Sequence, residues 1–167
     1  VTVTGSGFDP AAAVGAQPPF AGTESGYYVV FGKFADNWRP STGATSATRK
    51  NTSQKWALPQ DSYDALQDMG PSLAAQGVLL NPDGTFTAEL TVSKAAIDAA
   101  ATDPSLTNYG IYTYAGGGAK VAAAETFTPI TFVDSGSVAV SATTLPDNQS
   151  STVTVTGSGF LPEAAIG

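Results

Sequence analysis

A basic and aromatic segment is the part of this chain whose residues could bind a ligand. Residues 33–59 hold five of the seven Lys and Arg residues and both tryptophans, and Asp36 is the segment's one acid. Indole rings can act as stacking platforms, and guanidinium groups can hold anions. The pattern therefore predicts a candidate interaction face for an acidic polymer or a glycan, made of Trp38, Arg39, Arg49, Lys50 and Trp56.

The same segment has a second interpretation, which we favour. Its 27 residues show little hydrophobic periodicity, which indicates a long loop insertion. The segment carries a net charge of +4 and the remainder of the chain −11, so its cations are expected to pair with the excess carboxylates. Buried tryptophan more often supplies packing area than recognition, so we expect both indoles to hold the loop against the domain.

Two other sets of residues have weaker claims on a ligand. Asp61, Asp64 and Asp68 offer the oxygen atoms that Ca²⁺ takes, but their spacing matches no calcium loop and favours a solvated acidic helix. The three tyrosines of Asn108–Tyr114 could include a haem-ligating phenolate, although tyrosines in strands usually serve packing. We therefore expect no cofactor and no metal.

The composition excludes several classes of function. The 167 residues include no Cys and no His, which removes Ser-His-Asp triads, cysteine nucleophiles, the usual zinc sites and His-ligated haem. The formal net charge of −7 disfavours nucleic acid as a partner, because phosphate binding needs clustered cations on a basic face. No long apolar run occurs, so we expect no membrane insertion. No convergent set of titratable groups stands out, so we expect no enzyme.

A sequence repeat indicates the domain organisation. Residues 1–15 (VTVTGSGFDPAAAVG) recur as residues 153–167 (VTVTGSGFLPEAAIG) with three changes, at an offset of 152. Because such an offset is the size of an independently folding unit, we expect a tandem array of domains. We predict a repeat over residues 1–134 that lacks its first strand, and the first strands of the following repeat over 135–167. The candidate assembly residues in that tail are Val138, Val140, Leu145, Val153 and Val155.

Alternating apolar residues and turn signals predict an all-β fold. Residues 26–32 are apolar on both faces, as in a central strand, and residues 77–92 indicate a hairpin around an Asn81–Gly84 turn. We expect an immunoglobulin-like antiparallel β-sandwich with a long loop insertion that contains the Trp and Arg residues. The expected strands cover residues 1–5, 26–32, 77–80, 85–92, 108–114, 125–132, 137–143 and 151–157, with short helices near 62–69 and 93–101.

Several stretches of the chain resemble a known group of proteins. The runs VTVTGSGF, YVVFG, DGTFTAELTV and NYGIYTY resemble immunoglobulin-like repeats of actinobacterial surface proteins. The runs PPFAGTESGYYVVFGKFADNWRPSTGA and QKWALP resemble, more specifically, repeats that accompany HtaA-type haem-acquisition domains. The resemblance covers most of residues 1–132 and implies secretion and an extracellular location at the cell surface or cell wall. It implies no haem ligand, because the HtaA domain is a different module.

Two functions follow from these observations. The first is a non-enzymatic structural repeat of an extracellular surface protein or filament, whose copies assemble head to tail by strand addition. The second is a surface binding or adhesion module that captures a glycan, a host protein or haem. We favour the first, because the strand at residues 1–5 is expected to present an unpaired edge, and such an edge is a template for another chain. A tail that completes its own domain is the competing arrangement.

Overall fold

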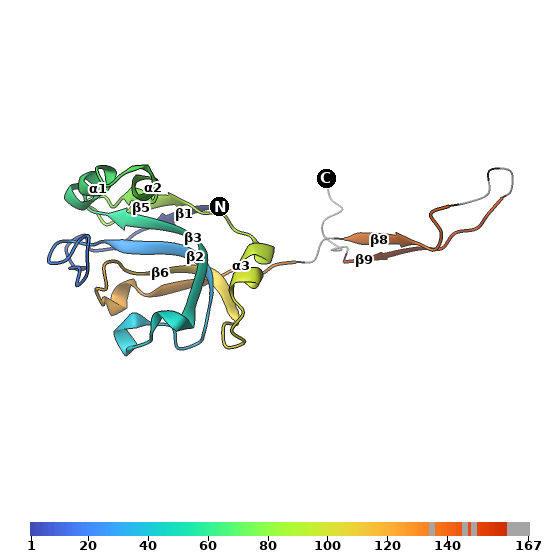
Figure 1. The fold of residues 1–167 in the computed structure, drawn as a ribbon, viewed down its shortest axis with the longest axis horizontal. Coiled ribbons are helices and arrows are strands. Elements are labelled where there is room, and N and C mark those ends of the chain that lie inside the picture. The colour runs from blue at the N-terminus through green and yellow to red at the C-terminus, as the bar shows by residue number, and fades with distance from the viewer. Residues whose placement is uncertain (134–135, 145–146, 148–149, 160–167) are drawn as a thin grey trace. The chain divides into compact units, whose positions relative to one another are not determined.

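The computed structural model describes residues 1–133, 136–144, 147 and 150–159, and Figure 1 shows its fold. The described chain is mostly β-structure with a few short helices, which is compatible with a β-sandwich. It divides into two compact units, Val1–Thr131 and Phe132–Gly167.

The first unit contains seven strands, three α-helices and three short 3₁₀ helices. The strands are β1 (Thr2–Gly5), β2 (Tyr27–Phe34), β3 (Arg49–Leu58), β4 (Gly77–Leu79), β5 (Phe86–Glu89), β6 (Asn108–Ala115) and β7 (Thr126–Pro129). The α-helices are α1 (Gln60–Gln67), α2 (Pro71–Ala74) and α3 (Lys94–Ala100), and the 3₁₀ helices are Pro40–Thr42, Ser46–Thr48 and Ala122–Ala124.

A five-stranded sheet in the order β4-β3-β2-β6-β7 forms the body of this unit. Strand β2 lies at its centre because its apolar side chains on both faces require cover on both sides, and six of its eight residues are buried. The sheet is mixed, since β3 and β4 run parallel while the other pairs are antiparallel. The prediction of a purely antiparallel fold is therefore wrong at the β3–β4 pair.

A second, two-stranded sheet is formed by β1 and β5. Strand β5 and helix α3 contact β3 of the larger sheet. The ring of Phe8 lies 5.1 Å from the ring of Tyr27 on β2 and 5.2 Å from that of Phe86 on β5, so this side chain joins the two sheets. Helix α3 begins where the sequence predicts, and the hydroxyl of its N-cap Ser93 accepts a hydrogen bond from the Ala96 amide.

The long loop predicted over residues 33–59 is wrong for its second half. Residues 49–58 form β3, which pairs with β2 from Arg49 to Ala57 through a register shift at Phe31/Gly32. Only Trp56–Leu58 of this strand also pair with β4, so its polar first seven residues lie at an edge of the sheet. An edge strand with one unpaired side tolerates Lys, Asn, Thr and Gln. The sequence of β3 therefore lacks the alternation of apolar residues by which strands are predicted.

The hairpin predicted over residues 77–92 is also wrong in its pairing. The turn forms as expected, with the Gly84 amide donating to the Asn81 carbonyl at 2.9 Å. The two strands on either side of it, however, enter different sheets, because β4 pairs with β3 and β5 pairs with β1. The turn therefore carries the chain from one sheet to the other.

The second unit contains an antiparallel hairpin of β8 (Ser137–Val140) and β9 (Val155–Ser158). Both strands lie within the ranges predicted from the sequence or one residue beyond them. All eight strand residues are exposed among the described part of the chain. The predicted assembly residue Leu145 lies outside the described residues.

Candidate functional site

Both tryptophans of the candidate interaction face are buried by protein contacts. The exposed fractions of Trp38 and Trp56 are 3% and 5%. Trp38 packs with Val30, Phe34 and Tyr112, while Trp56 packs with a second cluster that includes Phe20. The indole Nε1 of Trp56 donates to a backbone carbonyl, Ser25 O, at 2.7 Å. The indole rings therefore serve the core in this structure, as our favoured interpretation expects.

The two tryptophans belong to one aromatic layer on a single face of the five-stranded sheet. Tyr28 lies opposite Trp56 in the β2–β3 register and opposite Tyr114 in the β2–β6 register. Its ring lies 4.8 Å from that of Trp56 and 5.5 Å from that of Tyr114, and Tyr114 in turn lies 6.4 Å from Trp38. The sequence does not reveal this layer, because it depends on the strand register.

The cations of the candidate face have different surroundings. The half-buried Arg49 donates from Nη1 to the Trp38 carbonyl at 2.7 Å, and its guanidinium lies 5.4 Å from the ring centre of Tyr114. Arg39 is exposed, and its guanidinium lies 5.1 Å from the Trp38 ring centre. Lys50 is also exposed. Arg49 thus has a structural role, whereas Arg39 and Lys50 remain accessible to solvent.

A small pocket of about 150 Å³ opens beside Trp38. Its wall includes the exposed Arg39 and Asp36, whose carboxylate accepts a hydrogen bond from Asn108 Nδ2 at 2.8 Å. Its apolar side includes Phe127, which is 38% exposed and stacks on Tyr112 with a ring separation of 4.7 Å. An aromatic wall with a charged rim suits a small polar ligand such as a sugar.

The alternative ligand sets are not assembled into sites. Among the described residues, no three acids gather as a metal would require, and Asp61, Asp64 and Asp68 are all exposed. The buried hydroxyl of Tyr112 donates to the Asn108 carbonyl at 2.6 Å. Burial raises the pKa of Tyr114 to about 12, and its ring packs against those of Tyr28 and Trp38 in the aromatic layer.

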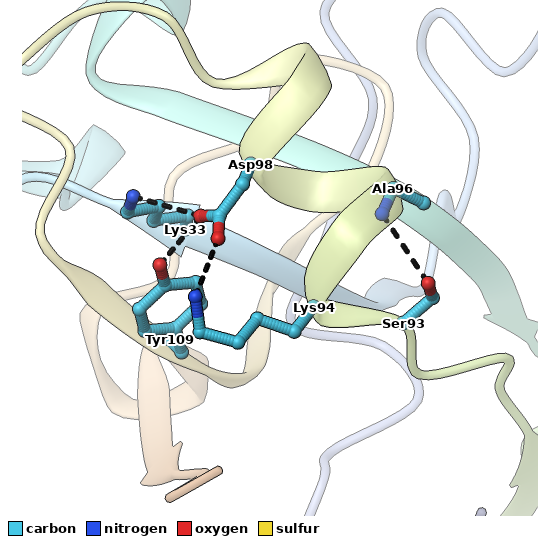
Figure 2. A network of polar contacts seen from close by, with 6 residues as sticks. All are labelled: Lys33, Ser93, Lys94, Ala96, Asp98 and Tyr109. Atoms are coloured by element: carbon cyan, nitrogen blue, oxygen red, sulfur yellow. Dashed lines mark hydrogen bonds and ion pairs between the residues drawn. The ribbon is translucent and has the colours of Figure 1, made fainter. Parts of the chain in front are cut away.

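A polar network on the opposite face of the sheet was not predicted from the sequence, and Figure 2 shows it. Asp98 on α3 accepts hydrogen bonds from Lys33 Nζ at 3.0 Å, Lys94 Nζ at 2.7 Å and Tyr109 Oη at 2.5 Å. Lys33 and Tyr109 are cross-strand neighbours in the β2–β6 register. Of these contacts, the one between Lys94 and Asp98 could be anticipated from the sequence, because residues four apart in a helix are neighbours.

The network shifts the pKa values of its carboxylate and of its two ammonium groups. The hydrogen bonds from Lys94, Tyr109 and Lys33 hold the pKa of Asp98 well below its usual range. Tyr109 and Asp98 together raise the pKa of Lys33, and Asp98 raises that of Lys94. A carboxylate held ionised between two ammonium groups is a poor proton donor or acceptor near neutral pH. This cluster therefore attaches α3 to the sheet.

The candidate assembly residues form an apolar face on the hairpin. Val140 lies opposite Val155, and Val138 lies opposite Gly157, so the three valines share one side. Val138 and Val155 are each 61% exposed, Val140 is 44% exposed and Val153 is half-buried. The other side carries the small or polar residues Ser137, Ala139, Thr156 and Ser158.

Comparison of the chain with protein-family models, with curated proteins and with solved structures gave no match. Within the described residues, no helix has the length and apolar character needed to cross a bilayer.

Proposed function

We propose that this chain is a non-enzymatic structural repeat of an extracellular surface protein or filament. In this proposal an immunoglobulin-like sandwich forms the body, and copies join head to tail by β-strand addition. The observation that supports it is the hairpin of β8 and β9, whose three-valine face has no cover among the described residues. The resemblance of the sequence to repeats of secreted, wall-attached proteins supports the extracellular location.

The hairpin is poorly suited to exist alone. A two-stranded hairpin is marginally stable in water without a third strand or a packing partner. Its valine face would gain about 25 cal/mol for each Å² of apolar surface removed from water. An exposed strand edge also pairs readily with another chain. Because a head-to-tail contact closes into a ring only at particular rotations, repeated addition of this kind generates a filament.

Substitution of the hairpin valines tests the proposal. In a Val138→Ser, Val140→Ser variant we expect assembly to be lost, measured by sedimentation velocity and by electron microscopy. The matched control is Ala139→Ser with Thr156→Ser, which changes the opposite side of the same strands and should assemble like the parent chain. A parent chain that stays monomeric at every accessible concentration would contradict the proposal, as would a valine variant that assembles normally.

The pocket beside Trp38 supports a second candidate, a surface module that captures a glycan. Its exposed Arg39 and Phe127 are placed to contact a sugar that carries a negative charge. Binding of acidic oligosaccharides that disappears in Arg39→Ala, with unchanged thermal stability, would support this function. Equal binding by Arg39→Ala and the parent chain would exclude the pocket as the site.

A further inference from the structure

Three aromatic rings form a stack that crosses three adjacent strands. The ring centre of Phe34 on β2 lies 3.8 Å from that of Tyr112 on β6, with an interplanar angle of 16°. The ring of Tyr112 lies 4.7 Å from that of Phe127 on β7, with an angle of 15°. Phe34 and Tyr112 are fully buried, whereas Phe127 is 38% exposed, because β7 is the last strand of the five-stranded sheet. The stack therefore ends at the surface in a ring that a ligand can reach.

A glycine on β6 leaves the space that this outermost ring occupies. A Cβ atom at Gly110 would lie 2.4 Å from Cε2 of Phe127 and 2.5 Å from the Thr128 carbonyl oxygen. Both separations are far shorter than van der Waals contact, so any other residue at this position would displace the ring or the strand. The Phe127 ring is thus held over β6, where it forms one wall of the pocket beside Trp38.

The polar wall of the same pocket offers two acceptor oxygens. The side-chain nitrogen of Asn108 donates to the Phe34 carbonyl at 3.2 Å and to Oδ1 of Asp36 at 2.8 Å. These bonds use both hydrogens of the amide and leave Asn108 Oδ1 and Asp36 Oδ2, to which no group donates within the described ranges. Because the two oxygens belong to one hydrogen-bonded pair, they suit two donors that lie close together on a ligand.

Arg39 supplies the donor groups of the pocket. Its guanidinium lies 5.1 Å from the ring centre of Trp38, and it donates to no residue that the structure describes. Contact with the indole restricts the guanidinium while its N–H groups stay available, and such a group recognises a carboxylate through two parallel hydrogen bonds. Asp36 balances the charge of Arg39, so an anionic ligand must place its charge at Arg39.

We propose that this pocket binds the pyranose ring of one hexuronic acid residue at the end of a glycan. The C–H face of the sugar stacks on Phe127, two neighbouring hydroxyl groups donate to Asp36 and Asn108, and the carboxylate accepts from Arg39. The volume of about 150 Å³ is below the range of about 300–1,000 Å³ that larger ligands fill, so the pocket takes one ring. This inference rests on the second candidate function, glycan capture, and names the sugar class and the role of each contact.

Other ligands of similar size match the pocket less well. A phosphate or sulfate group has no apolar face for Phe127 and would meet the Asp36 carboxylate. An aliphatic acid could bond to Arg39 but lacks the two donors that the acceptor oxygens require. A neutral hexose satisfies the ring and the acceptors and leaves Arg39 without a counter-charge. A hexuronic acid is the class that uses all of these groups at once.

Ligand-observed NMR with defined monosaccharides tests the inference. The probes are the methyl glycosides of glucuronic, galacturonic and mannuronic acid, with methyl glucoside as the neutral comparison. We expect at least one uronide to bind at least about tenfold more tightly than the glucoside, because its carboxylate adds hydrogen bonds to a charged group. Saturation of the protein's aromatic protons should transfer mainly to the C–H protons of one face of the sugar. No uronide binding, or equal binding of uronide and glucoside, would overturn the inference.

Substitutions separate the roles of the contact residues. Arg39→Gln should reduce the preference for the uronide over the glucoside to less than about threefold, because a neutral donor replaces the charge. Phe127→Leu should weaken both sugars by about two- to tenfold, since it removes the ring and keeps an apolar side chain. The matched control is Lys50→Gln, which removes an exposed cation of the same segment outside the pocket and should bind like the parent chain. The affinity ratio of the two sugars does not depend on the fraction of folded protein, so a loss of stability cannot imitate the Arg39 result.

The outcomes distinguish this inference from the function on which it rests. Binding of acidic oligosaccharides without binding of any methyl uronide would overturn the single-ring site and leave glycan capture intact. Uronide binding that is unchanged in both Arg39→Gln and Phe127→Leu would overturn the assignment to this pocket. Absence of binding by the oligosaccharides as well as the uronides would overturn the inference together with the glycan-capture function.

Discussion

Replacement of Trp56 by Phe isolates one buried hydrogen bond of the aromatic layer. The substitution keeps an aromatic ring opposite Tyr28 but removes the Nε1 donor, which lies 2.7 Å from the Ser25 carbonyl. A buried carbonyl that loses its partner costs about 1–3 kcal/mol. The lost ring atoms add about 1 kcal/mol of transfer free energy. We therefore expect the free energy of unfolding to fall by about 2–4 kcal/mol.

Trp38→Phe is the matched control for this prediction. Trp38 is equally buried, but its indole nitrogen donates to no described residue, so the control removes ring atoms and the contact with Arg39 alone. Its expected cost is about 1–2 kcal/mol. Urea unfolding followed by circular dichroism measures both variants without relying on tryptophan fluorescence. Equal losses in the two variants would refute the assigned role of the Ser25 hydrogen bond.

Two further predictions concern carboxylates. Because the pKa of Asp98 is lowered in the folded state, its contribution is present above its unfolded pKa of about 4 and is lost as the pH falls. When the pH is lowered from about 7 to about 3, the free energy of unfolding should therefore fall less for Asp98→Asn than for the parent chain, as measured by urea unfolding. An equal fall in the two proteins would contradict this prediction. The buried Glu125 accepts from the amide and the hydroxyl of Ser41 at 2.7 and 2.6 Å. Ser41→Ala should cost about 1.5–3 kcal/mol in thermal or urea unfolding, whereas the exposed Ser46→Ala should cost less than about 0.5 kcal/mol; similar effects of the two would contradict the role of Ser41.

The two central strands that the sequence predicted, β2 and β6, have a local pattern that reports their burial. Strand β2 is apolar on both faces and lies at the centre of the sheet, and β6 beside it follows the same rule. Strand β3 was missed because its first seven residues have a neighbour on one side only, so their polar side chains carry no core signal. The local sequence also does not show which strands pair with each other. The Asn81–Gly84 turn forms as predicted, yet the strands on either side of it belong to different sheets.

The polar sites show the same division between local and non-local information. The spacing of Lys94 and Asp98 within one helix can be seen in the sequence, but their meeting with Lys33 and Tyr109 requires the β2–β6 register. The carbonyl partners of the basic segment are also set by the fold. Lys55 Nζ donates to the Ala75 carbonyl at 2.5 Å, and Arg49 donates to the Trp38 carbonyl.

These contacts explain why the charge contrast between residues 33–59 and the rest of the chain gives few ion pairs. Of the five cations in that segment, Lys33 forms a salt bridge with an acid among the described residues, and Arg49 and Lys55 bond to backbone carbonyls. The carbonyls of Trp38 and Ala75 lie outside the strands, so they have no ladder partner and accept from side-chain donors instead. Arg39 and Lys50 are therefore the cations of the segment that remain exposed, and a ligand that recognises its charge must contact them.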